Sequence, residues 1–115
     1  MIRICGADEV PKGGVVRAEV AGMEIAVVHA DDDAFYAVYD ECSHAAVALS
    51  EGEIDGCTLE CWLHGSRFDL RTGEPTGPPA TEPVPVYPVE IRDGDVYLPA
   101  DEDGRPMPSN GVTAP

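Results

Sequence analysis

The sequence holds two short cysteine–histidine pairs, Cys42-Ser43-His44 and, sixteen intervening residues later, Cys61-Trp62-Leu63-His64. Two thiolates and two imidazoles could form a structural zinc site, which takes four mixed sulfur and nitrogen ligands tetrahedrally. They could also bind a 2Fe–2S cluster in which cysteines hold one iron and histidines the other. The spacing favours the iron–sulfur cluster, because each pair supplies one cysteine and one histidine and so can reach both irons. Zinc sites more often pair Cys with Cys and His with His.

The residues that follow the second pair add a family resemblance. From Cys42 to His64-Gly65-Ser66-Arg67-Phe68-Asp69, the chain resembles a Rieske-type 2Fe–2S ferredoxin, the ferredoxin component of Rieske non-haem iron oxygenase systems. The likeness extends from about residue 2 to residue 99. It implies one Rieske 2Fe–2S cluster per chain. The cofactor and metal ligands that it implies are Cys42 and Cys61 on the inner iron and His44 and His64 on the outer iron.

The resemblance also assigns residues around the cluster. Gly65 allows close approach of backbone amides to the sulfurs. Ser66 stands where a hydroxyl donates to a bridging sulfide in higher-potential relatives, and Phe68 stands where those relatives have a tyrosine. Pro78 and Pro79 resemble the proline-rich loop that covers the cluster, and two successive prolines make a stiff, apolar segment. An ordinary connecting turn is the alternative for these prolines.

Two positions depart from the higher-potential relatives. Those relatives carry an extra cysteine in each ligand loop, and these two cysteines form a disulfide. The matching positions here are Val47 and Leu63. The departure points to the soluble ferredoxin branch and to a reduction potential in the lower part of the Rieske range.

Two cysteines remain outside the ligand pairs, Cys5 and Cys57. Both stand in strand-like segments, and the simplest interpretation is that they are small buried hydrophobic residues. A disulfide between them is the alternative, although a reducing cytosol argues against it.

Composition restricts the partners. The chain has 115 residues, a net charge of −15 and a single lysine, Lys12. Nucleic acid is therefore not expected as a partner, because it requires a basic surface. A basic protein partner is favoured by charge complementarity, while simple solubility is the alternative role of the acidity. No stretch approaches the ~20 apolar residues of a membrane span, and no signal peptide is visible, so we expect a cytoplasmic protein without membrane contact.

Short strands punctuated by Gly and Pro predict the fold. Residues 17–20, 23–29, 34–39, 86–92 and 96–99 are rich in β-branched and aromatic side chains. We expect an all-β fold, a Rieske-type antiparallel sandwich or barrel spanning residues 1–99. A small cluster-binding subdomain, about residues 41–80, would be inserted in it, with a single helical turn near 45–49. Residues 100–115 are rich in Asp, Glu, Gly and Pro and predict a disordered tail.

The sequence indicates an electron carrier and no enzyme. It has no nucleotide-binding glycine loop and too few histidines for a separate mononuclear iron site. The resemblance implies that single electrons pass from an NAD(P)H-dependent flavoprotein ferredoxin reductase to a terminal oxygenase or another redox enzyme. One alternative is a Rieske subunit associated with nitrite reductase or iron–sulfur assembly; the other is a zinc-stabilised binding module. The sequence leaves open the partners' identity, the final substrate, the exact potential and the oligomeric state.

Overall fold

The computed structural model describes residues 1–42, 47–62, 65–77 and 82–112. These residues form strands and two short 3-10 helices, which confirms the predicted all-β class. The elements are β1 (Ile2–Gly6), η1 (Ala7–Glu9), β2 (Gly14–Val20), β3 (Met23–His29), β4 (Phe35–Tyr39), η2 (Leu49–Glu51), β5 (Ile54–Asp55), β6 (Thr58–Glu60), β7 (Arg67–Asp69), β8 (Val86–Tyr87), β9 (Glu90–Arg92) and β10 (Asp95–Leu98).

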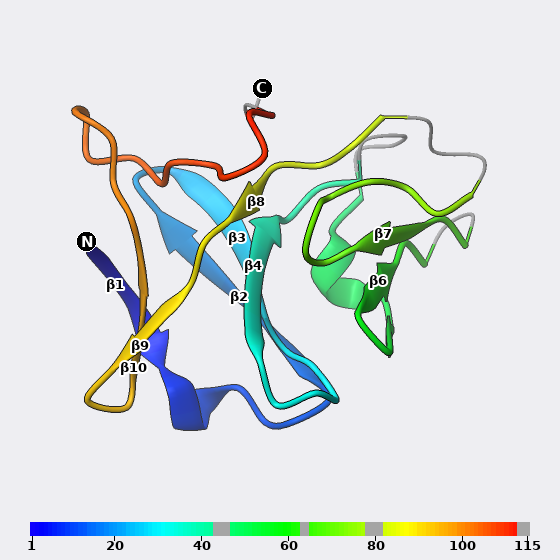
Figure 1. The fold of residues 1–115 in the computed structure, drawn as a ribbon, viewed down its shortest axis with the longest axis horizontal. Coiled ribbons are helices and arrows are strands. Elements are labelled where there is room, and N and C mark those ends of the chain that lie inside the picture. The colour runs from blue at the N-terminus through cyan, green and yellow to red at the C-terminus, as the bar shows by residue number, and fades with distance from the viewer. Residues whose placement is uncertain (43–46, 63–64, 78–81, 113–115) are drawn as a thin grey trace.

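The strands form three antiparallel sheets, with strand orders β2-β3-β4-β8, β1-β10-β9 and β5-β6-β7. The first two sheets lie beside each other, and the third sheet forms a separate lobe with η2 on one side of the molecule (Figure 1). The chain leaves the four-stranded sheet after β4, builds the third sheet and returns at β8. Both cysteine–histidine pairs belong to this excursion.

The β2–β3 hairpin is the longest local element, and its turn explains its register. Ala21 and Gly22 both have positive φ, 51° and 78°, as the tight turns that match strand twist require. Seven residue pairs follow, from Val20 opposite Met23 to Gly14 opposite His29. The predicted turn at Ala21-Gly22 and the strands on both sides of it are therefore present.

Strand β3 separates two hydrophobic cores, because its side chains alternate between the two faces. Ala26 and Val28 pack into the core that also contains Cys42 and Cys61, which we call the site-side core. Ile25 and Val27 pack into a second core with Cys5 and Tyr87, the far-side core. The candidate site is thus supported by a strand whose four central residues, Ile25 to Val28, are fully buried.

The predicted strand over residues 86–92 is wrong in its continuity. Val86 and Tyr87 pair with β4 in the four-stranded sheet, whereas Glu90 to Arg92 pair with β10 in another sheet. Pro88 falls between them and has no N–H to donate to a ladder, so the chain changes sheets there. The hairpin at Asp93-Gly94 persists, with positive φ at both residues.

The segment after β10 differs from the expected disorder over the part that the structure describes, residues 100–112. Gly104 turns the chain with φ of 77°, and the Ser109 amide donates to the Val86 carbonyl at 2.7 Å. In Figure 1 this segment, drawn in orange and red, returns across the top of the four-stranded sheet. The physical reason is the open side of β8, the edge strand of that sheet, whose unpaired backbone groups accept such partners.

No helix among the described residues is long and apolar enough to cross a membrane. The expected helical turn near 45–49 is displaced. A 3-10 turn forms at Leu49–Glu51, and residues 43–46 lie outside the described part of the chain.

Candidate metal centre

Two of the four candidate ligands, Cys42 and Cys61, belong to one buried core. Cys42 follows β4 and Cys61 follows β6. Their exposed fractions are 3% and 0%, and both pack in the site-side core with residues of β3, β4 and β7. His44 and His64 lie outside the described residues, as do Pro78 and Pro79 of the proline-rich loop. The fold therefore brings together two thiols from segments nineteen positions apart.

The first ligand-bearing segment, as we call the stretch that carries the candidate ligands Cys42 and His44, is closed at its base by a buried carboxylate. Asp40 accepts hydrogen bonds from the Ser50 amide and the Ser50 hydroxyl, each at 2.6 Å. Arg17 on β2 makes an ion pair with the same carboxylate through Nε at 3.0 Å. Inside this closure, the Cys42 amide donates to the Val47 carbonyl at 3.0 Å. Buried polar groups that are fully partnered hold a loop in one conformation, so Cys42 is preorganised.

The second ligand-bearing segment, as we call the stretch that carries the candidate ligands Cys61 and His64, is held by hydrogen bonds between its own backbone groups at Cys61, Gly65 and Ser66. The Cys61 amide donates to the Ser66 carbonyl at 2.6 Å, and the Gly65 amide donates to the Cys61 carbonyl at 2.9 Å. Gly65 has a φ of 75°, in the left-handed region that side chains disfavour. Position 65 thus favours glycine because of its backbone conformation.

The two ligand-bearing segments meet at a close backbone contact. Gly52, directly after η2, would place a Cβ 1.7 Å from the Glu60 carbonyl oxygen. The Glu60 amide also donates to the Glu53 carbonyl at 2.8 Å, one residue before Cys61. Only glycine permits this approach, which fixes the end of one segment against the start of the other.

Ser66 and Phe68, assigned by resemblance to the surroundings of the cluster, are both buried to about 1% exposure. Phe68 packs in the site-side core together with Cys42 and Cys61. It also pairs with Leu59 on β6 and bridges to Pro75. These positions are compatible with the assigned roles, which stay predictions.

The other cysteines occupy different environments. Cys5 is buried in the far-side core, and burial, with a smaller contribution from the Glu9 carboxylate, raises the pKa of its thiol. Cys57 is half-buried in the turn between β5 and β6, so its expected place in a strand is wrong. Neither cysteine forms a disulfide. Both contribute apolar contacts, Cys57 at the margin of the site-side core.

An acidic groove that sequence reasoning missed lies beside the second ligand-bearing segment. It has a volume of about 280 Å³ and is lined by Glu51, Gly52, Glu53, Glu60 and Trp62. Trp62, which directly follows Cys61, is 50% exposed, one of four large hydrophobic side chains exposed among the described residues. The signal available in the sequence was the alternation of Glu51 and Glu53 just after the first pair and the Glu60 that precedes the second.

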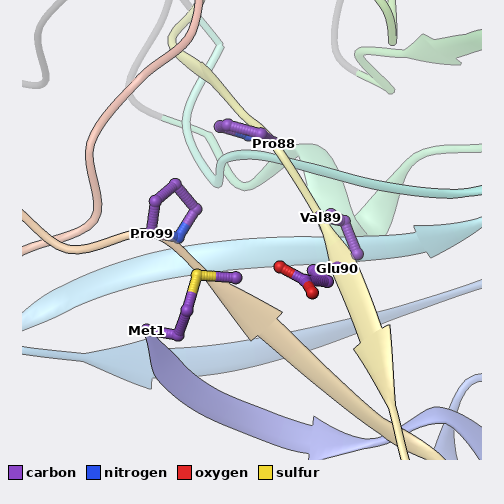
Figure 2. Close-up of a pocket in the computed structure, with 5 residues that line it drawn as sticks. All are labelled: Met1, Pro88, Val89, Glu90 and Pro99. Carbon is purple, nitrogen blue, oxygen red and sulfur yellow. The ribbon is translucent and has the colours of Figure 1, made fainter.

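A second depression, of about 330 Å³, lies at the β1-β10-β9 sheet. Met1 and Pro99 lie on one side and Pro88, Val89 and Glu90 on the other (Figure 2). None of these five residues belongs to a ligand-bearing segment. The Glu90 carboxylate forms an ion pair with Arg92 at 2.6 Å. The depression is therefore not part of the candidate metal centre.

The donor chemistry fits a 2Fe–2S cluster. Thiolates are soft ligands suited to iron–sulfur centres, and the side chains of two cysteines are buried in one hydrophobic core here. Among the described residues, no group of three or more potential ligands gathers. The remaining donors would be the two histidines, each two or three positions after a cysteine. When bound, such a cluster accepts and releases one electron.

Comparisons with known proteins agree with this chemistry. Residues 1–88 match the family model described as "Rieske [2Fe-2S] domain". A 3-phenylpropionate/cinnamic acid dioxygenase ferredoxin subunit from Photorhabdus laumondii is 42% identical over 101 residues, which cover 87% of this chain and 94% of that protein.

Solved structures give the same result. A chain of the complex of reduced oxygenase and oxidized ferredoxin in carbazole 1,9a-dioxygenase has a TM-score of 0.78 and 38% identity, over 84% of this chain and 90% of that one. A putative nitrite reductase NADPH small subunit has a TM-score of 0.75 over 86% of this chain and 97% of that one. At 22% identity, the second likeness shows the fold alone.

Proposed function

The chain belongs to the Rieske [2Fe-2S] domain family, and from this membership we propose that it is a ferredoxin of an aromatic-ring dioxygenase system. It carries single electrons from an NAD(P)H-dependent flavoprotein reductase to a terminal oxygenase. The observation that carries this proposal is the 42% identity to a dioxygenase ferredoxin subunit over nearly the full length of both chains. We assign its action to the cytoplasm, where thiols stay reduced.

The proposed ligands are Cys42 and Cys61 for the inner iron and His44 and His64 for the outer iron. The burial of both thiols supports the first half of this assignment. For the second half, the support is the place of each histidine just after a cysteine and the family match across both pairs. Neutral imidazoles in place of two thiolates make such a centre less negative and easier to reduce.

The residues around the thiols supply preorganisation. Asp40 and Gly52 fix the two ligand-bearing segments to the sheet and to each other. A rigid, dry surrounding reduces the rearrangement that accompanies a change of charge. Trp62 and the acidic groove beside it present the adjacent surface to solvent. We propose this surface as the contact for a partner with a basic face.

The alternatives have weaker support. A nitrite reductase subunit is favoured only by a fold likeness at 22% identity. A zinc-stabilised module disagrees with the family to which residues 1–88 belong.

A reconstituted electron-transfer chain tests the proposal. The purified protein is combined with an NADH-dependent flavoprotein reductase and a ring-hydroxylating oxygenase from which its own ferredoxin has been removed. Product formation should depend on this protein and should disappear when its iron has been stripped. If the reductase reduces the protein but no oxygenase of this class accepts electrons from it, while nitrite reductase does, the oxygenase assignment is wrong.

A further inference from the structure

One carboxamide in the C-terminal segment joins two distant parts of the backbone. The Asn110 side chain donates through Nδ2 to the Thr72 carbonyl at 3.0 Å and to the Val84 carbonyl at 2.8 Å. Its Oδ1 accepts from the amides of Val86 and Val112, each at 3.3 Å. Both hydrogens of the amide group and its oxygen are therefore used, which makes the contact specific to this side chain.

These contacts meet at the neck of a long loop. The Val84 amide donates to the Gly73 carbonyl at 2.9 Å, which closes the segment that runs from Gly73 to Val84. A Cβ at Gly73 would lie 2.2 Å from the Val84 carbonyl oxygen and 2.7 Å from Asn110 Nδ2. The neck is thus a tight backbone contact that admits no side chain at Gly73, and Asn110 spans it.

The neck borders the candidate metal centre. Val84 and Val86 pack in the site-side core with Cys42 and Cys61. Val86 is further held by Ser109, whose amide donates to the Val86 carbonyl at 2.7 Å. Opening of the neck would release these valines and admit water to the core that holds both thiols. The residues matched by the family model end at 88, so the carboxamide comes from outside the matched region.

We propose that Asn110 is a positioning residue that clamps the loop neck at Gly73 and Val84 and thereby slows loss of metal from the buried thiols. The clamp belongs to this chain's C-terminal segment and acts through backbone groups of Thr72, Val84 and Val86. Its second effect, metal retention, rests on the proposed ligation by Cys42 and Cys61. Its first effect, local closure, does not.

The test compares three variants of the iron-loaded full chain. Asn110→Ala removes all four hydrogen bonds. Asn110→Asp keeps the acceptor toward Val86 but loses both donors and places a carboxylate against two carbonyl oxygens, so it should be at least as disruptive. Met107→Ala is the matched control, because Met107 is an exposed residue of the same segment. The substitution leaves the backbone hydrogen bond from the Met107 amide to the Pro99 carbonyl unaffected.

Hydrogen exchange followed by mass spectrometry reads the clamp directly. In both Asn110 variants, exchange in peptides covering residues 72–73 and 84–86 should rise about 5–30-fold, the factor that corresponds to about 1–2 kcal/mol of lost local stability. Exchange in β3 should stay unchanged, and Met107→Ala should match the unmodified protein. Unchanged exchange at the neck, or an equal rise in β3, would overturn the clamp.

The rate of iron release to a chelator, measured by visible absorbance, tests the second effect, metal retention. Release should accelerate in both Asn110 variants and not in Met107→Ala. A faster-exchanging neck with unchanged iron release would contradict the role in metal retention. A protein that holds no iron at all would refute the proposed ligation while the exchange result still decides the clamp.

Discussion

The carboxylate of Asp40 accepts two hydrogen bonds from Ser50, one from its amide and one from its hydroxyl, both at 2.6 Å. The nine residues between these partners include the first cysteine–histidine pair. The carboxylate side chain is fully buried, so its interaction with Ser50 is not screened by solvent.

Ser50→Ala should therefore lower the stability of the protein. The buried carboxylate loses one hydrogen bond to a charged group, which costs about 1.5–3 kcal/mol. We expect a lower thermal midpoint and faster bleaching of the visible absorption on heating. Thr58→Ala is the control, because its hydroxyl bonds the Asp55 carbonyl at an exposed turn, where removal should cost about 0.5 kcal/mol or less. Equal effects of the two substitutions would show that Asp40 does not anchor the loop.

Electron transfer from the reductase should slow as salt is added. The net charge is −15, and screening shortens to about 3 Å near molar salt. Stopped-flow measurement of the second-order rate gives the dependence. The double variant Glu51→Gln, Glu53→Gln, in the groove beside Trp62, should slow the low-salt rate more than Glu102→Gln, Asp103→Asn, which removes the same charge from the C-terminal segment. A rate that is flat with salt would leave solubility as the only role of the acidity.

Phe68→Tyr should raise the reduction potential. The new hydroxyl would enter the core that holds both candidate thiolates, and a donor near sulfur favours the more negative, reduced form. A net gain of ~0.5–1 kcal/mol corresponds to roughly 20–45 mV for one electron. Ser66→Ala should lower the potential. Phe35→Tyr is the control, since Phe35 packs outside the site-side core against His29. If voltammetry finds no rise in potential for Phe68→Tyr, Phe68 does not lie near the cluster sulfurs.

Tyr87→Phe should stabilise the fold. The Tyr87 hydroxyl is buried and has no hydrogen-bond partner among the described residues, an arrangement that costs about 1–3 kcal/mol. Tyr36→Phe is the control and should not stabilise the fold, because it removes a hydroxyl that donates to Asp32 at 2.9 Å. Thermal melting should rise for the first variant and stay or fall for the second. A lower midpoint for Tyr87→Phe would mean that the hydroxyl is partnered in solution.

The same tyrosine should make stability fall at alkaline pH. Burial raises the pKa of Tyr87 to about 12, whereas a tyrosine in the unfolded chain ionises near pH 10. Between these values the unfolded state loses the proton first, so stability decreases as pH rises from about 10 to about 12. In Tyr87→Phe, melting measured across this interval should decline less steeply than in the unmodified protein.

The sequence could predict what depends on neighbouring residues. The turn at Ala21-Gly22 and the alternation on either side define the β2–β3 hairpin, and the two cysteine–histidine pairs define the candidate site. The sequence contains Pro88, but it does not show that the chain changes sheets there. Only the sheet topology shows that Pro88 separates β8 from β9. Local patterns report local structure, and these parts of the fold are local.

Long-range partners explain what the sequence could not predict. Asp40 has the appearance of an ordinary acidic turn residue, and nothing near it indicates that Arg17, on a different strand, will pair with it. Asn110 contacts backbone at positions 24 to 38 residues earlier in the chain. The composition of residues 100–112 predicts disorder because it holds little apolar surface, whereas order there arises from hydrogen bonds to the edge of β8.

The electron paramagnetic resonance spectrum of the reduced protein tests the central claim most directly, namely that Cys42, His44, Cys61 and His64 hold a Rieske 2Fe–2S cluster. The account predicts the signal of a mixed-ligand 2Fe–2S centre, with two irons per chain. That signal should be lost in His44→Ala and in His64→Ala and kept in Cys5→Ser and Cys57→Ser. A native signal in either histidine variant, or a colourless protein that contains zinc in place of iron, would contradict it.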